Sequence, residues 1–237
     1  WINGKMVGYS EDSRLPAHFN ISKFLKKGKN RLAMKVFRFS DGSYLEDQDY
    51  WKYSGIERNV FIQARPKSRM NDYVLGNKLI NQYKDGYFTL DVNMLHPQKG
   101  QKVEVKVLSA TGKSLFKQIQ SITSPADTLI HFEKLLKNVQ PWSAESPYLY
   151  TLVINTTDRN GRVEESVAQP FGFRTVEMKN GQLLVNGVAI TIKGVNRQEH
   201  NAVHGRTLSI GEMVKDVKMM KQFNINAVRT SHYPNYS

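Results

Sequence analysis

Hydrophobic and polar residues alternate in several short segments in the middle of the chain. In residues 86–94 every second residue from Phe88 to Met94 is apolar, and in residues 102–108 three valines alternate with lysine and glutamate. A period of two places the apolar side chains on one face, as in an antiparallel strand that is buried on one side. The same kind of pattern predicts strands over residues 32–39, 59–65, 127–132 and 148–155.

Turn-forming residues separate these segments. They occur at residues 96–100 (HPQKG), 111–113 (TGK) and 158–161 (DRNG). Short strands that recur every ~8–12 residues with such turns between them are typical of a β-sandwich. We therefore predict an antiparallel sandwich over residues 67–176, beginning after Pro66.

The hydrophobic period becomes helical towards the end of the chain. Ser209 and Glu212 have the spacing of a capping box, in which each side chain bonds to a free backbone N–H group at the start of a helix. Apolar residues at helical spacing continue to Phe223. The flanking segments are an Asn-Gly hairpin at 183–188, a strand at 190–195 and a strand at 225–229. This order predicts one strand–helix–strand unit of a larger parallel sheet.

The first residues predict a hairpin. Asn3 and Gly4 lie between short apolar stretches, and a two-residue turn of this kind needs positive φ at both positions. No secretory signal is visible there, and the compartment cannot be read from this start. A chain that opens within a hairpin is expected to begin inside a domain, and a single strand–helix–strand unit needs the other strands of its sheet. We therefore expect the chain to be a piece of a longer protein.

The composition removes several classes of protein. Without cysteine, disulfide scaffolds, thiolate zinc sites and cysteine nucleophiles are excluded. A net charge of +13 raises nucleic acid as a partner, but the excess is spread evenly. Basic and acidic side chains number 12 and 7 in residues 1–66, 14 and 10 in 67–176, and 8 and 4 in 177–237. We therefore expect no nucleic-acid partner, and no apolar run approaches the ~20 residues of a membrane span.

Two polar clusters follow the predicted strands of the parallel sheet. Residues 196–200 (NRQEH) follow the first strand, and residues 229–235 (RTSHYPN) follow the second. In α/β barrels the reactive side chains lie at the carboxyl ends of the strands. Side chains of these types can bind sugar hydroxyls or hold a catalytic carboxylate, although the spacing alone fits ordinary loops equally well.

Other chemistries are less well supported. His200, His204 and His232 could converge on zinc, but the first two lie in a loop rather than on one helix face. Ser231 and His232 are neighbours at a strand end, where successive side chains point in opposite directions, so a serine hydrolase is not indicated. The acidic residues of segment 41–51, Asp41, Glu46, Asp47 and Asp49, lack the spacing of a calcium loop. Trp1 and Trp51 fit a sugar-stacking role and a core role equally well.

Four stretches resemble glycoside hydrolase family 2, and within it the bacterial multidomain β-galactosidases. They are residues 8–16 (GYSEDSRLP), 40–49 (SDGSYLEDQD) with Trp51 and 54–56 (SGI), 193–197 (KGVNR), and 226–234 (NAVRTSHYP). The resemblance implies a mainly β fold in three parts. These are the C-terminal part of a jelly-roll sugar-binding domain (1–66), an immunoglobulin-like β-sandwich (67–176) and the first βαβ elements of a TIM barrel (177–237).

The resemblance also implies roles for four residues. Asp12 would contact the sugar and a sodium ion, and His232 would bond to the galactosyl hydroxyls. Arg229 would orient the nucleophilic carboxylate. Gln198 stands where the family usually has histidine, so its amide would alter or take over that sugar contact. Magnesium is the second implied ion, with its ligands outside this chain.

The implied activity is retaining hydrolysis of terminal β-D-galactosides by two glutamates on later barrel strands. Glu199 and Glu212 do not fall in the motifs that carry those glutamates, so we expect no catalytic residue in this chain and no activity from the chain alone. The full-length protein is expected to form a homo-oligomer. The alternatives are a β-glucuronidase or β-mannosidase of the same family, or a non-catalytic carbohydrate-binding or scaffolding module.

Overall fold

A computed structural model of the chain describes residues 1–12, 15–46, 49 and 51–235. Ser13, Arg14, Asp47 and Gln48, which belong to two of the motifs above, lie outside the described residues. The chain divides into two compact units. Residues 62–191 form the sandwich unit, and residues 1–61 together with 192–237 form the terminal unit.

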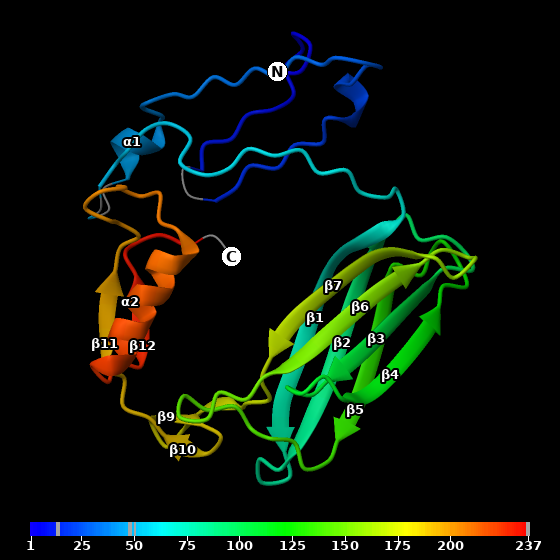
Figure 1. The fold of residues 1–237 in the computed structure, drawn as a ribbon, viewed down its shortest axis with the longest axis vertical. Helices are drawn as coiled ribbons and strands as arrows, with labels where there is room; N and C mark the ends of the chain where they lie inside the picture. Colours follow the sequence, from blue (N-terminus) through cyan, green and yellow to red (C-terminus); the bar gives the residue numbers. More distant parts are fainter. Residues whose placement is uncertain (13–14, 47–48, 50, 236–237) are drawn as a thin grey trace. The chain divides into compact units, whose positions relative to one another are not determined.

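The sandwich unit contains two antiparallel sheets, one with strand order β1-β2-β5 and one with order β4-β3-β6-β7 (Figure 1). The strands are β1 (Arg69–Ile80), β2 (Asp85–Leu95), β3 (Lys102–Leu108), β4 (Ser114–Ser121), β5 (Leu129–Leu136), β6 (Tyr150–Thr157) and β7 (Val163–Phe171). The strands predicted at 86–94, 102–108, 127–132 and 148–155 are therefore confirmed as β2, β3, β5 and β6, with small shifts of their ends.

The predicted alternation describes the core of the sandwich correctly. Phe88, Leu90 and Val92 of β2 are fully buried, as are Val103, Val105 and Val107 of β3. Phe88 lies with its ring edge towards Phe116 at a centroid distance of 5.2 Å. Burial of such side chains is the main favourable term in folding, and the two facing sheets supply it here.

The pattern missed strands β1, β4 and β7. β4 and β7 are edge strands, each paired on one side only. All their side chains are half-buried or exposed, except one buried residue at the end of β7. β1 pairs with β2 but shifts register between Met70 and Asp72, which interrupts its alternation. Edge strands need less apolar surface, so their sequences carry a weaker signal.

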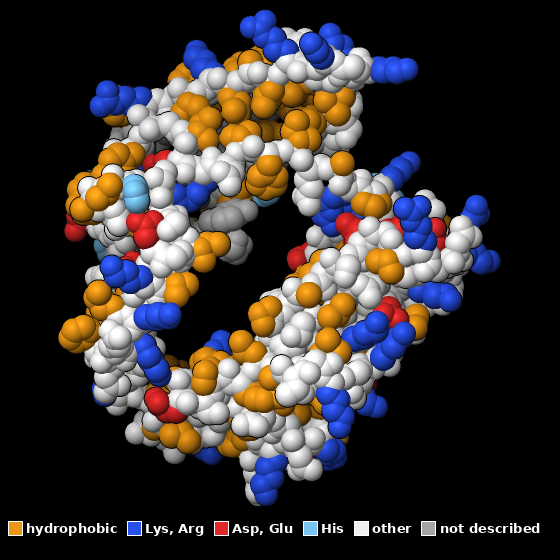
Figure 2. Space-filling view, viewed as in Figure 1, with side chains coloured by type: hydrophobic (Ala, Val, Ile, Leu, Met, Phe, Trp, Pro, Cys, Tyr) orange, Lys and Arg blue, Asp and Glu red, His pale blue; other side chains and the backbone are white. Residues whose placement is uncertain are grey.

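The strands predicted at 32–39 and 59–65 are wrong for this structure. Leu32 forms one isolated bridge with Ile2, and residues 33–39 and 59–65 have no strand assignment. Their apolar side chains are exposed, and Figure 2 shows hydrophobic side chains gathered over this N-terminal part of the chain. The exposed residues include Met34, Val36, Phe37, Phe39 and Phe61. Alternation marks a face that favours burial, but a strand forms only where another strand supplies hydrogen bonds.

The predicted hairpins are confirmed. Ile2 and Lys5 form a bridge around Asn3 and Gly4, whose φ angles are 52° and 80°. The second hairpin joins β9 (Gln182–Val185) to β10 (Val188–Ala189), and β8 (Val176–Lys179) completes a small antiparallel sheet. The Asn186 side chain accepts a hydrogen bond from the Thr175 N–H and donates one to the Trp142 carbonyl, which fixes this sheet within the sandwich unit.

The terminal unit contains the predicted strand–helix–strand element. β11 (Gly194–Arg197) and β12 (Ala227–Thr230) pair in parallel, and α2 (Ile210–Gln222) connects them. Ser209 and Glu212 form the predicted capping box. β11 begins four residues later than predicted, because only residues 194–197 align with β12. The short helical turns η1 (Ser22–Phe24) and α1 (Gly42–Leu45) also belong to this unit, and no helix among the described residues is long and apolar enough to cross a membrane.

We expect the stability of the sandwich unit to fall in acid because of Asp85. Its carboxylate accepts hydrogen bonds from the side chains of Lys137 and Asn81 and from the Asn138 N–H. These contacts lower the pKa of Asp85 to about 2, and the bond from Lys137 has the largest effect. A carboxyl group whose pKa is lowered by folding stabilises the folded state at pH values above its pKa in the unfolded chain, which is about 4. This contribution is lost as the pH falls towards 2.

The Asp85→Asn variant tests this expectation. At pH 7 its urea midpoint should lie below that of the unmodified chain, because the amide nitrogen cannot accept from Lys137. The two midpoints should converge as the pH is lowered from about 4 to about 2. A difference that is the same at both ends of this range would contradict the assignment.

Candidate functional site

The carboxyl ends of β11 and β12 lie side by side. Asn196 is the register partner of Arg229, and the Ser231 N–H donates to the Arg197 carbonyl over 2.9 Å. Gln198 therefore follows one strand where His232 follows the other. Three of the four predicted site residues are brought to one edge of the sheet, as the sequence predicted, and an open depression over the two strands is lined by Asn196 and Arg229 among others.

The segment that carries His232 has unused hydrogen-bonding capacity. Ser231 is 2% exposed, and its Oγ has no hydrogen-bond partner among the described residues. The same holds for the buried Nδ1 of the half-buried His232. Buried polar groups are nearly always hydrogen-bonded in native proteins. This pair therefore marks a place where a ligand, a water or another group has hydrogen bonds to make.

Gln198 lies against the segment that contains Asp49, Trp51 and Tyr53. Its Nε2 is 3.5 Å from the carbonyl oxygen of Asp49, and the side chain is half-buried. His200 is held by the same segment, because its Nε2 is 3.0 Å from the Tyr53 hydroxyl and its ring lies 4.2 Å from that of Trp51. His200 and Trp51 thus pack against each other.

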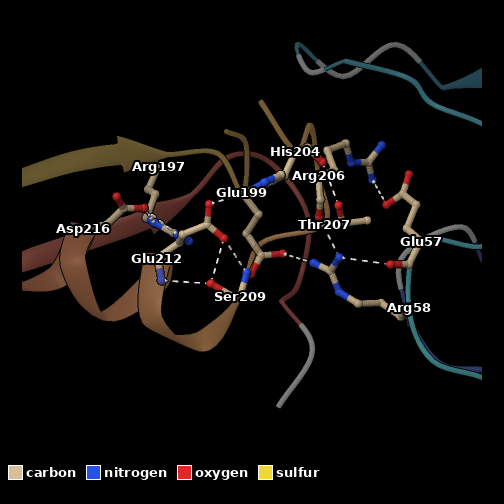
Figure 3. A network of polar contacts seen from close by, with 10 residues as sticks. All are labelled: Glu57, Arg58, Arg197, Glu199, His204, Arg206, Thr207, Ser209, Glu212 and Asp216. Carbon is tan, nitrogen blue, oxygen red and sulfur yellow. Dashed lines mark hydrogen bonds and ion pairs between the residues drawn. The ribbon is translucent and has the colours of Figure 1, made fainter. Parts of the chain in front are cut away.

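Two arginines that the sequence patterns did not single out connect these segments (Figure 3). Arg206 is 8% exposed and forms an ion pair with Glu57, while Arg58 donates to the Arg206 carbonyl. Arg58 also lies 3.5 Å from the Glu199 carboxylate. The partners are about 140 to 150 residues apart, so no local pattern could reveal them. In the sequence, the only signal was that the segment with Glu57 and Arg58 and the segment with Glu199 and Arg206 each contain an arginine and a glutamate without a predicted role.

Glu199 and Glu212, in the loop after β11 and at the start of α2, have structural partners. Glu199 faces Arg58, and Glu212 accepts hydrogen bonds from the N–H and hydroxyl groups of Ser209. The contacts with Ser209, and then with His204, lower the pKa of Glu212 to about 2. A carboxyl with so low a pKa is ionised at neutral pH and does not donate a proton as a general acid. Figure 3 also shows Arg197 paired with Asp216 of α2, which fixes the end of β11 to the helix.

Three domain models of one family match nearly the whole chain. Their descriptions are glycosyl hydrolases family 2, sugar binding domain (residues 1–66), glycosyl hydrolases family 2 (68–174), and glycosyl hydrolases family 2, TIM barrel domain (176–237). The chain belongs to glycosyl hydrolase family 2. This membership confirms the predicted fold class: a mainly β chain with the end of a jelly-roll domain, an immunoglobulin-like sandwich and the first elements of a TIM barrel.

Relatives in family 2 are similar over the full length of the chain. A protein named beta-galactosidase from Priestia megaterium is 41% identical over 244 residues, which cover 100% of this chain and 24% of that protein. A protein of the same name from Alteromonas mediterranea is 43% identical over 244 residues, which cover 100% of this chain and 23% of that protein. The chain therefore spans about a quarter of the length of these relatives.

Solved structures of glycosidases share the fold. A beta-glycosidase from Bacteroides vulgatus is 25% identical with a TM-score of 0.85, covering 99% of this chain and 30% of that one. A β-glucuronidase from Ruminococcus gnavus is 26% identical with a TM-score of 0.61, covering 72% of this chain and 27% of that one.

Asp12, the fourth predicted site residue, belongs to the stretch that matches the sugar binding domain of family 2. It is exposed, and its Oδ1 accepts a hydrogen bond from the Leu15 N–H over 2.8 Å. The described residues contain no group of three or more His, Asp or Glu side chains that could hold a metal ion. A sodium ion at Asp12 would also need other oxygen ligands, such as backbone carbonyls or water, and the assignment stays a prediction.

Proposed function

We propose that the full-length protein is a retaining β-galactosidase that hydrolyses terminal β-D-galactosides, and that this chain supplies substrate contacts without the catalytic glutamates. One observation carries the proposal: the 41–43% identity over the whole chain with the proteins named beta-galactosidase. The edge of the sheet where Gln198, Arg229 and His232 meet is a suitable place for these contacts, because barrel enzymes bind substrate at the carboxyl ends of their strands.

In this proposal the four predicted residues contact the sugar, the nucleophile or a sodium ion. His232 and Gln198 hydrogen-bond to the sugar hydroxyls, and contacts that tighten as the ring approaches the oxocarbenium-like transition state accelerate the reaction. Arg229 orients the carboxylate of the nucleophile. Asp12 contacts the sugar and a sodium ion, and magnesium binds to ligands outside this chain. The two glutamates lie on later barrel strands, and Glu199 and Glu212 serve the structure.

A β-glucuronidase is the second candidate, favoured by the likeness to the Ruminococcus gnavus structure. That activity needs a cationic pocket for the substrate carboxylate. A β-mannosidase of the same family and a non-catalytic carbohydrate-binding module are the remaining alternatives. The proteins named beta-galactosidase have a higher identity to this chain than the β-glucuronidase, and they match a larger part of it. This comparison favours the galactosidase.

A panel of aryl β-glycosides, assayed on the full-length protein, tests the proposal. We expect the galactoside to have the highest kcat/KM, and the 237-residue chain assayed beside it to give no turnover. Preference for the glucuronide or the mannoside would contradict the substrate. Turnover by the chain alone at the rate of the full-length protein would contradict the absence of catalytic carboxylates, and size-exclusion chromatography of the same preparation would test the expected homo-oligomer.

A further inference from the structure

Arg206 is buried, and both terminal nitrogens of its guanidinium group have partners. Its Nη2 lies 3.3 Å from the Glu57 carboxylate, and its Nη1 donates to the Trp51 carbonyl over 3.1 Å. The guanidinium carbon lies 5.5 Å from the ring centre of Tyr53 and 5.7 Å from that of Tyr233. A buried charge is tolerated when it is paired and hydrogen-bonded, and both conditions are met here.

A second arginine binds the same loop at both of its ends. Arg58 donates through Nη1 to the Arg206 carbonyl over 2.6 Å, and its Nη2 faces Glu199 at 3.5 Å. Glu199 directly follows Gln198. Figure 3 shows Glu57 and Arg58 side by side on one segment, with Arg206 and Glu199 opposite them. The loop after β11 is thus fixed to residues 51–58 at its beginning and at its end.

The contacts of Arg206 join three segments that carry or flank the proposed sugar-binding residues. One contains Trp51, Tyr53 and Glu57, the second is the loop after β11 that begins with Gln198, and the third follows β12 and contains Tyr233 next to His232. We propose that Arg206 is a positioning residue that holds the Gln198 loop and the His232 segment in the geometry needed to bind the sugar.

This proposal rests on the proposed function, because it assigns the sugar contacts to Gln198 and His232. Its physical basis is the shape of the guanidinium group. A planar fork can bond to a carboxylate and a carbonyl in its plane while rings cover its faces, whereas a lysine ammonium is a compact, strongly hydrated charge that cannot do all of these at once. Small displacements of a substrate-positioning group can lower the rate by about 10²-fold.

The test uses the full-length protein with Arg206→Ala and Arg206→Lys. We expect R206A to lose about 10²-fold in kcat/KM, the size of effect that follows a small misplacement of bound substrate. R206K should lose less, and added guanidinium ion should restore part of the activity of R206A. Arg65→Lys is the matched control, because Arg65 binds the Glu165 carboxylate and the Met70 carbonyl but belongs to the sandwich unit. R65K should keep the kcat/KM of the unmodified protein.

Hydrogen exchange gives a readout that does not depend on activity. In R206A and R206K the amides of residues 198–206 and 231–233 should exchange faster, while those of α2 should not change, because its cap is formed by Ser209 and Glu212. If R206A does not fold, R206K decides by the same measurements. Unchanged kcat/KM, or unchanged exchange in both segments, would overturn the proposal.

The two proposals fail in different ways. Preference of the unmodified protein for another glycoside contradicts the galactosidase, but the Arg206 variants are then compared on that preferred glycoside. Absence of turnover with every glycoside contradicts the proposed function, and the exchange measurement still decides whether Arg206 holds the two segments.

Discussion

Replacing Phe88 by alanine is expected to lower the free energy of unfolding of the sandwich unit by about 3–5 kcal/mol, the usual cost of truncating a fully buried phenylalanine. Phe88 is 0% exposed, and its ring packs against those of Phe116 and Phe171. These partners lie on β4 and β7, in the sheet that faces β2. The truncation therefore leaves a cavity between the two sheets.

The measurement is urea unfolding of the 237-residue chain followed by the fluorescence of Trp142. Replacing Trp1 and Trp51 by phenylalanine leaves Trp142, which belongs to the sandwich unit, as the only tryptophan. Leu129→Ala is the control, since Leu129 is 62% exposed on β5, and an exposed substitution usually changes stability by about 0.5 kcal/mol or less. A loss of the same size in both variants would mean that Phe88 does not hold the sheets together.

The core of the sandwich was predictable because one local pattern determines it. In β2 and β3 each strand is covered on one face by the opposite sheet, so the apolar residues must recur every second position. Residues 32–39 carry a similar pattern, but in the described chain Leu32 forms a single bridge with Ile2 and Ala33 bonds to Trp1, with no strand assigned there. A local pattern does not contain the partner. For the same reason the bulge that follows Met70 and the edge position of β7 were not predictable.

The candidate site was predictable in part. Gln198, Arg229 and His232 follow two strands, and the parallel pairing of these strands, which the order strand–helix–strand implies, is enough to bring them together. The contacts of Arg206 depend instead on residues 51–57, which approach the loop only in the folded chain. A charged residue in a polar loop is usually solvated, and nothing in the sequence around Arg206 distinguishes it from one that is buried.

Replacing His232 by phenylalanine in the full-length protein should lower kcat/KM for its preferred β-glycoside by about 10²–10³-fold, the effect of removing one preorganised donor that faces the transition state. Phenylalanine keeps a planar ring in the half-buried position but has no nitrogen atoms. If His232 bonds to sugar hydroxyls more strongly in the transition state than in the ground state, kcat should fall more than KM changes. Steady-state kinetics with the aryl glycoside measures both constants.

His204→Phe is the matched control for this substitution. His204 lies in the loop after β11, is exposed, and bonds through Nδ1 to Glu212 over 3.0 Å, which places it at the cap of α2. The H204F variant should keep the kcat/KM of the unmodified protein and lose only some stability. The affinity for a lactone that mimics the flattened sugar ring should fall in H232F in parallel with kcat/KM, because such analogues share the contacts of the transition state. Equal kcat/KM in H232F and H204F would exclude His232 from the sugar-binding contacts and would leave Gln198 as the proposed sugar contact at this edge of the sheet.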